Sequence, residues 1–290
     1  MKTSDNIDFL SSQVTSADYY YINLTPKQSE SGTVVCGGRE QCAPDYCLER
    51  NGFRFLSIEF VSSGCGTLTL HGQTWPLRLG AVFCYGPDIP HRIQSDPSAP
   101  LLKHFVDVTG SGLATLLKRT ALNRAPLYAS QPFRMRDVFE ALLQTGMTES
   151  RHRNELCVLL LRQILLYADE TALPLKDASS PAWQTYLRCR QFIEQHFTTI
   201  GRVEQAARQC HLDIAYLCRL FKRYANESPL QMLTRLKMAR AADLLATRSP
   251  LIRQAGAAVG YPDPYHFSRV FKRVYGIPPE AFLQAVTRNR

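Results

Sequence analysis

The chain has 290 residues, of which 45% are hydrophobic and 20% are charged, a balance that excludes a disordered chain. No apolar run approaches the ~20 residues of a membrane-spanning helix, and the N-terminal MKTSDNIDFLSS lacks the pattern of a signal peptide, so we expect a cytoplasmic protein. The net charge of +9 is concentrated in residues 181–290, which contain 17 Lys and Arg against 7 Asp and Glu, whereas residues 1–180 contain 17 against 18. This asymmetry predicts a polyanionic partner for the C-terminal part.

Residues 32–108 consist of short apolar runs separated by turn signals such as Asn51-Gly52 and His71-Gly72. Several short strands at this spacing predict a β-sandwich or a small barrel. After about Gly112 the apolar period becomes helical, and the segment 155–167 is apolar over much of its circumference. We expect this helix to be buried on two sides, by the β-rich part and by a second subunit.

Residues 171–181 are rich in Pro and Ser, and we expect them to link a first domain at 1–170 to a second domain at 182–290. After this linker the pattern is helical throughout. A long helix is expected from Ser228, with Pro next and Gln completing a capping box, and a short helix is expected from Ser249-Pro250.

The second domain contains one short unit twice. RLFKRYANESP and RVFKRVYGIPP recur at a shift of 50 residues, and matching residues continue upstream at a shift of 49. The duplication predicts two helix-turn-helix units, at 203–225 and 252–275. We expect Gly260 to make the tight turn of the second unit, and Cys210 to take that place in the first.

The second helix of each unit has two different faces. Apolar residues at helical spacing predict the buried stripes Leu217, Leu220, Phe221 and Tyr224, and Phe267, Val270, Phe271 and Val274. The opposite faces are small or polar and carry two cations each, as a helix entering the major groove of DNA requires. We therefore expect DNA contacts from Ala215, Cys218, Arg219, Lys222, Tyr265, Ser268, Arg269 and Lys272. The simpler interpretation, two solvated helix faces, does not explain the charge asymmetry.

These residues resemble the C-terminal signature of the AraC/XylS family of regulators, which is matched by Val259, Gly260, Tyr261, Phe267, Arg269, Phe271, Lys272, Gly276 and Pro279. The resemblance implies a two-domain α+β protein, with a cupin-like N-terminal β-barrel and trailing helices for effector sensing and dimerisation. An all-α domain of two helix-turn-helix units joined by a long helix would follow and occupy successive major grooves. Promoter DNA, RNA polymerase, a small-molecule effector and a second copy are the implied partners. The resemblance implies an activator without enzymatic activity or cofactor.

The stretch Gly80-AVFCYGPDIP-His91 resembles the cupin signature of the family's sensor domain more weakly. Metal-binding cupins need an H-x-H pair and a Glu, and the corresponding region offers only His71, so we expect no metal. A sugar or a small organic acid is the effector that the resemblance implies. Effector contacts are expected from Arg50, Glu59, Tyr85, His91, Lys103, His104 and Phe105.

Two other functions stay open. Cys36, Cys42 and Cys47 lie close together in the sequence, as in a metal- or thiol-responsive sensor, although no CxxC pair occurs. The second is a cupin enzyme fused to a DNA-binding domain, and the missing ligand residues weigh against it.

Overall fold

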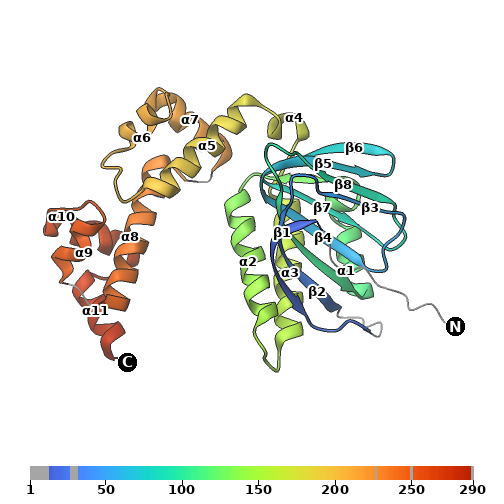
Figure 1. Ribbon diagram of the computed structural model, residues 1–290. Helices are drawn as coiled ribbons and strands as arrows, with labels where there is room; N and C mark the ends of the chain where they lie inside the picture. The colour runs from blue at the N-terminus through green and yellow to red at the C-terminus, as the bar shows by residue number, and fades with distance from the viewer. Residues whose placement is uncertain (1–12, 27–31, 226, 249–250, 289–290) are drawn as a thin grey trace. The chain divides into compact units, whose positions relative to one another are not determined.

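The computed structural model describes residues 13–26, 32–225, 227–248 and 251–288 (Figure 1). Contacts within the chain separate two units, Met1–Ala178 and Ser179–Arg290, and each is described by itself.

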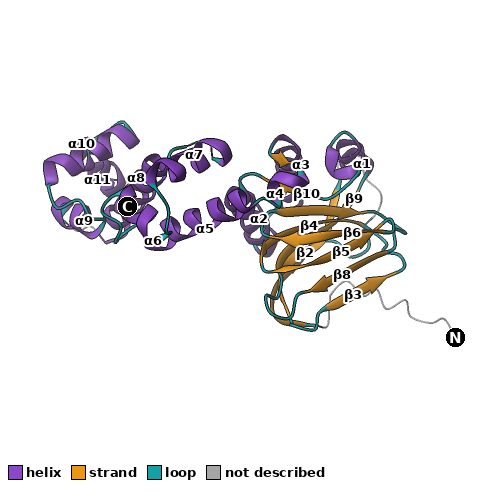
Figure 2. Cartoon of the chain, turned by 90° about the horizontal axis from the view of Figure 1, so that it is seen from above, coloured by secondary structure: helices purple, strands orange, loops and turns teal. Residues whose placement is uncertain are grey.

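The strands of the first unit form two antiparallel sheets (Figure 2). Their bounds are β1 Val14–Tyr21, β2 Thr33–Cys42, β3 Cys47–Arg50, β4 Leu56–Ser63, β5 Cys65–Leu70, β6 Gln73–Arg78, β7 Ala81–Tyr85, β8 His91–Ser95, β9 Leu102–Thr109, β10 Leu127–Ala129 and β11 Ala172–Leu173. The strand order is β1-β2-β9-β4-β7-β10-β11 in one sheet and β3-β8-β5-β6 in the other. The cupin-like α+β class is confirmed, but among the described residues no strand pairing joins the two sheets into a closed barrel.

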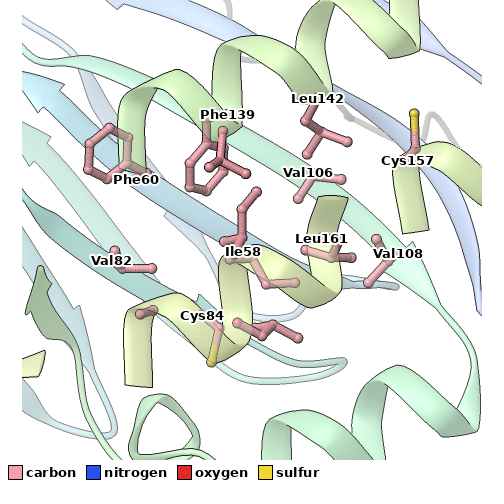
Figure 3. Packing of buried hydrophobic residues seen from close by; sticks show 14 of the residues in the cluster. Ile58, Phe60, Val82, Cys84, Val106, Val108, Phe139, Leu142, Cys157 and Leu161 are labelled. Atoms are coloured by element: carbon pink, nitrogen blue, oxygen red, sulfur yellow. The ribbon is translucent and has the colours of Figure 1, made fainter. Parts of the chain in front are cut away.

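Helices cover one face of the larger sheet. They are α1 Ser111–Lys118, the short 3-10 helix η1 Ala121–Asn123, α2 Pro132–Met147, α3 Arg153–Glu170 and α4 Leu175–Ala178. The main core lies between this face and α2 and α3, as Figure 3 shows for Ile58, Val106 and Leu161. Phe60 of β4 stacks on Phe139 of α2 with ring centroids 5.2 Å apart. Because side chains alternate along a strand, the residues between these apolar ones face away from the helices.

The segment that we expected to be a linker carries regular structure. β11 pairs with β10, with Tyr128 opposite Leu173, and α4 packs against β10 as well. The first unit therefore continues to Ala178, and the next helix already begins at Pro181.

The described part of the second unit is helical. Its helices are α5 Pro181–His196, α6 Val203–Gln209, α7 Ile214–Tyr224, α8 Pro229–Arg248, α9 Ile252–Ala258, α10 Pro264–Tyr275 and α11 Pro279–Arg288. α6 with α7 and α9 with α10 form the two expected helix-turn-helix units, and α8 packs against helices of both. The expected capping box at the start of α8 is confirmed, since the Ser228 amide donates to Gln231 Oε1 (2.7 Å) and the Gln231 amide to Ser228 Oγ (3.2 Å). The expected start of the short helix, Ser249-Pro250, lies outside the described residues.

The turn inside each helix-turn-helix unit corrects one expectation. Gly260 adopts the left-handed conformation in the second unit (φ 79°), as a tight turn requires. In the first helix-turn-helix unit the residue with positive φ is His211 (φ 57°), whereas Cys210 has φ −85°. His211 is also the residue that lies 49 positions before Gly260, so the repeat itself points to it.

No helix in the described part of the chain is long and apolar enough to cross a membrane.

Candidate DNA-binding face and effector pocket

The expected buried stripes of α7 and α10 lie in the core of the second unit. Leu217, Leu220, Phe221 and Tyr224 are buried, and so are Phe267, Val270 and Phe271. Val274 is the exception with 38% of its surface exposed, since it lies in the last turn of α10. The stripes hold each helix by one side and leave the other side to solvent.

The opposite sides of the two helices carry the expected DNA-contacting residues. Tyr265 is 81% exposed and Ser268 is half-buried, while the other members are exposed: Ala215, Cys218, Arg219, Lys222, Arg269 and Lys272. None of the ion pairs in the described residues involves Arg219, Lys222, Arg269 or Lys272. These four cations are therefore available to an external anion.

Aspartate caps fix the N-terminal ends of both helices. Asp213 Oδ1 accepts hydrogen bonds from the amides of Ala215 (2.8 Å) and Tyr216 (3.3 Å), and Asp263 Oδ1 accepts one from the amide of Tyr265 (2.9 Å). The caps order the first turn, from which recognition helices commonly contact base edges.

A small pocket in the first unit is lined by strands of both sheets. Five of the seven expected effector contacts line it: Arg50 of β3, Glu59 of β4, Tyr85 of β7, and Lys103 and Phe105 of β9. Its free space is about 10 Å³, close to what one water molecule needs. A larger ligand therefore requires the lining side chains to move.

The structure places the two histidines elsewhere. His104 faces the opposite side of β9, where its Nε2 lies 2.9 Å from Glu140 Oε1 of α2. His91 stacks on Tyr85 with ring centroids 3.7 Å apart, and its Nδ1 lies 2.9 Å from the Ile89 carbonyl oxygen. Burial lowers the pKa of both imidazoles.

Four further lining residues were not expected: Glu40, Tyr46, Leu48 and Asp107. Asp107 follows Lys103 and Phe105 at the period of two that defines one face of a strand, and this signal could have identified it. Glu40 lies opposite Lys103 in the pairing of β2 with β9, a register that local sequence does not specify.

A buried charge network occupies the pocket. Lys103 Nζ lies 2.8 Å from Glu40 Oε2 and 3.0 Å from Glu59 Oε2, with all three side chains no more than 3% exposed. The Tyr85 hydroxyl donates to the other oxygen of Glu59 (2.6 Å). Although burial disfavours the ammonium, Glu40 and Glu59 raise the pKa of Lys103 well above its ordinary value.

The pocket residue Asp107 is a weaker acid than an ordinary aspartate. Burial raises the pKa of its carboxyl to about 7, and the negative charge of Glu59 adds to the increase. The hydrogen bond from Cys36 acts in the opposite direction, with its thiol donating to Asp107 Oδ2 over 3.4 Å.

The three clustered cysteines lie in different surroundings. Cys36 and Cys42 are buried on β2, and burial raises the pKa of both thiols, that of Cys42 to about 12. Cys47 begins β3 in the other sheet, where Arg92 Nε donates to its Sγ (3.4 Å). Among the described residues no group of three or more His, Cys, Asp or Glu side chains is placed to hold a metal ion. High thiol pKa values also disfavour a reactive thiolate.

Comparison with known proteins gives two matches that cover both units. The helix-turn-helix domain family matches residues 206–285, and the AraC-like ligand binding domain family matches residues 35–165. Fold and sites thus define a DNA-binding transcription regulator with an effector-binding domain. The chain belongs to the AraC/XylS family.

Three of the curated relatives are operon regulators that match over most of their length. The Msm operon regulatory protein of Streptococcus mutans is 24% identical over 256 residues, 87% of this chain and 92% of the relative. The raffinose operon transcriptional regulatory protein of Pediococcus pentosaceus is 25% identical over 281 residues, 92% and 98%. The arabinose operon regulatory protein of Escherichia coli is 29% identical over 249 residues, 82% and 84%.

Proposed function

We propose that the chain is an effector-responsive transcription activator that places α7 and α10 in successive major grooves of promoter DNA. The observation that carries this proposal is the duplicated helix whose buried side is apolar and whose exposed side bears cations without ion-pair partners. Two such helices read neighbouring grooves when they lie about one DNA turn apart, ~34 Å.

The exposed residues suit different contacts with DNA. Arg219 and Arg269 can fork onto a guanine, and Ser268 can bond to either type of base. Ala215, Cys218 and the Tyr265 ring can contact thymine methyl groups. Lys222 and Lys272 are flexible point charges suited to phosphates.

We propose that a second copy covers α3. Leu156, Leu159 and Leu166 are 46%, 62% and 56% exposed, and their spacing of three and seven places them on one face of the helix. The opposite face is buried in the core through Cys157, Leu161 and other residues. An exposed leucine row on a helix otherwise packed into the domain fits a symmetric subunit contact.

For the effector we propose a small hydroxyl-rich molecule such as a sugar. The carboxyl oxygens of Glu40, Glu59 and Asp107 can accept hydrogen bonds from hydroxyls, and the buried Tyr46 hydroxyl has no hydrogen-bond partner among the described residues. Relatives are named for raffinose, lactose and arabinose operons. The proposed setting is the cytoplasm, with RNA polymerase as the protein partner and no catalytic role.

Binding of the full chain to DNA tests the first proposal. Duplexes selected from a random pool by the wild type should contain two half-sites about one turn apart, and affinity for them should fall steeply with salt. Selection of one half-site, or affinity independent of salt, contradicts it. Thermal shift with arabinose, lactose and raffinose against citrate and acetate tests the effector class, since stabilisation by the acids alone would overturn it.

A further inference from the structure

A buried lysine lies in the middle of the helix that connects the two helix-turn-helix units. Lys237 of α8 is 2% exposed, and no hydrogen bond or ion pair of the described residues involves it. Its Nζ lies 5.4 Å from the ring centroid of Tyr261, in the turn between α9 and α10. Burying an ammonium without an anionic partner is costly, so its retention calls for a physical reason.

Gly260 leaves the space that the ammonium occupies. A Cβ atom at Gly260 would lie only 2.9 Å from Lys237 Nζ and 3.5 Å from the carbonyl oxygen of Thr198. The matching turn residue of the first helix-turn-helix unit, His211, also has a positive φ, but it is exposed and carries a full side chain. The positive φ of this turn is therefore compatible with a side chain in the first helix-turn-helix unit, whereas a Cβ atom at Gly260 would displace the Lys237 ammonium.

Two residues near Gly260 come from outside the second helix-turn-helix unit. Thr198 lies in the connection between α5 and α6, and Lys237 comes from α8, which packs against helices of both helix-turn-helix units. The Tyr261 ring lies 5.4 Å from the His266 ring and 6.3 Å from the Phe267 ring, both on α10. Lys237 and Tyr261 thus connect α8 to α10, and the turn at Gly260 between them also lies close to the Thr198 carbonyl oxygen before α6.

We propose that Lys237 and the space at Gly260 form a clamp that fixes α10 relative to the first helix-turn-helix unit. The clamp would set the spacing between half-sites that the protein accepts. This inference rests on the proposed binding in two grooves. Lys237 acts as a positioning residue and makes no DNA contact in it. Without the clamp, each recognition helix keeps its own half-site, but the gain from holding both at one fixed spacing falls.

The test uses the full-length wild type, K237M, K237R and G260A, with H211A as the matched control at the same turn position of the first unit. Two-half-site duplexes from wild-type selection are rebuilt with the spacer shortened or lengthened by one and two base pairs, and each half-site is also placed alone. The preference for a spacing is the ratio of the affinity at the best spacing to the affinity at an altered one. We expect this ratio to be about tenfold lower in K237M and G260A than in the wild type, while the affinity for single half-sites is unchanged. K237R and H211A should keep the wild-type preference.

The outcomes separate the two levels of the argument. If the wild type selects a single half-site, the two-groove function itself fails. If the wild type shows a fixed spacing and folded K237M keeps it, the clamp is overturned. Circular dichroism and thermal melting establish folding. Should K237M not fold, G260A and K237Q decide, and an unchanged spacing preference in both overturns the clamp.

Discussion

Lys103 and Glu59 form an ion pair in which Nζ and Oε2 lie 3.0 Å apart while both side chains are almost fully buried. Glu40 completes a triad from the other side of the same ammonium, at 2.8 Å. Each charge is stable in this environment only because the others are present.

Lys103→Ala should therefore destabilise the chain by about 3–5 kcal/mol, because two carboxylates would remain buried without their cation. Urea unfolding followed by circular dichroism measures the loss. Arg92→Ala is the matched control, because its 3.9 Å pair with Glu49 is exposed and should contribute little to stability. Equal effects of the two variants would contradict the assignment of a buried network.

We expect the exposed residues of α7 and α10 to make two classes of DNA contact. Arg219→Ala and Arg269→Ala should each cost about 1–3 kcal/mol at the selected site and relax base preference at one position. Lys222→Ala and Lys272→Ala should weaken all sequences evenly and reduce the salt slope by about one. Anisotropy titrations on selected and scrambled duplexes measure both quantities. If the arginine variants lose equally on both duplexes, the arginines contact phosphates instead.

Cys218 provides a chemical probe of the same face, because it is exposed on α7 beside Arg219. Alkylation with N-ethylmaleimide should abolish specific DNA binding, and bound DNA should protect the thiol. The variant C218S should bind DNA and resist the reagent. Cys65, exposed in the first unit, is the internal control whose labelling should be independent of DNA. DNA affinity that survives complete labelling of Cys218 would exclude this face from the interface.

The carboxyl of Asp107 predicts a pH dependence of stability. Its folded pKa of about 7 lies above the unfolded value, so the folded state holds a proton that the unfolded state releases. This contribution is fully present below the unfolded pKa of about 4 and is lost as the pH rises through the folded pKa. Asp107→Asn should remove the loss, so the variant should gain stability relative to the wild type between about pH 4 and pH 7 in urea unfolding. A constant difference across that range would contradict the raised pKa.

Two leucines of α3 that lie two residues apart distinguish its buried face from its proposed subunit contact. Leu159 is 62% exposed and Leu161 is fully buried. Leu159→Glu should give a folded monomer, whereas Leu161→Glu should unfold the first unit, because an unpaired charge would enter the core. Sedimentation and circular dichroism distinguish the outcomes. A Leu159→Glu chain that still sediments as a dimer, or a wild type that sediments as a monomer, would contradict the proposed subunit contact.

The periodicity of the sequence was enough to predict most of the buried and exposed faces of α7 and α10. The repeat and the helical period together placed Arg219, Cys218 and Arg269 on exposed faces, because a single helix needs only local information to assign its sides. Val274 was misplaced because the core ends before the last turn of α10. The point at which a helix leaves the core depends on tertiary packing, which the helical period of the sequence does not encode.

The pocket was harder to predict because strands far apart in the chain build it. Strand parity could have separated Lys103 from His104, which lie on opposite faces of β9. Glu40 could not be assigned in this way, since its position opposite Lys103 depends on the register between β2 and β9. Long-range pairing also explains why β11 was missed, because its two residues gain strand geometry only beside β10.

The connection between α4 and α5 is short. From Ala178 to Pro181 the backbone takes three peptide steps, which reach at most about 11 Å. β11 hydrogen-bonds to β10, β10 to β7, and β7 carries the pocket residue Tyr85. A displacement of Tyr85 by a ligand would therefore start two strands away from β11, and β11 is followed by α4 and a short connection to α5 rather than by the eleven-residue linker that the sequence predicted.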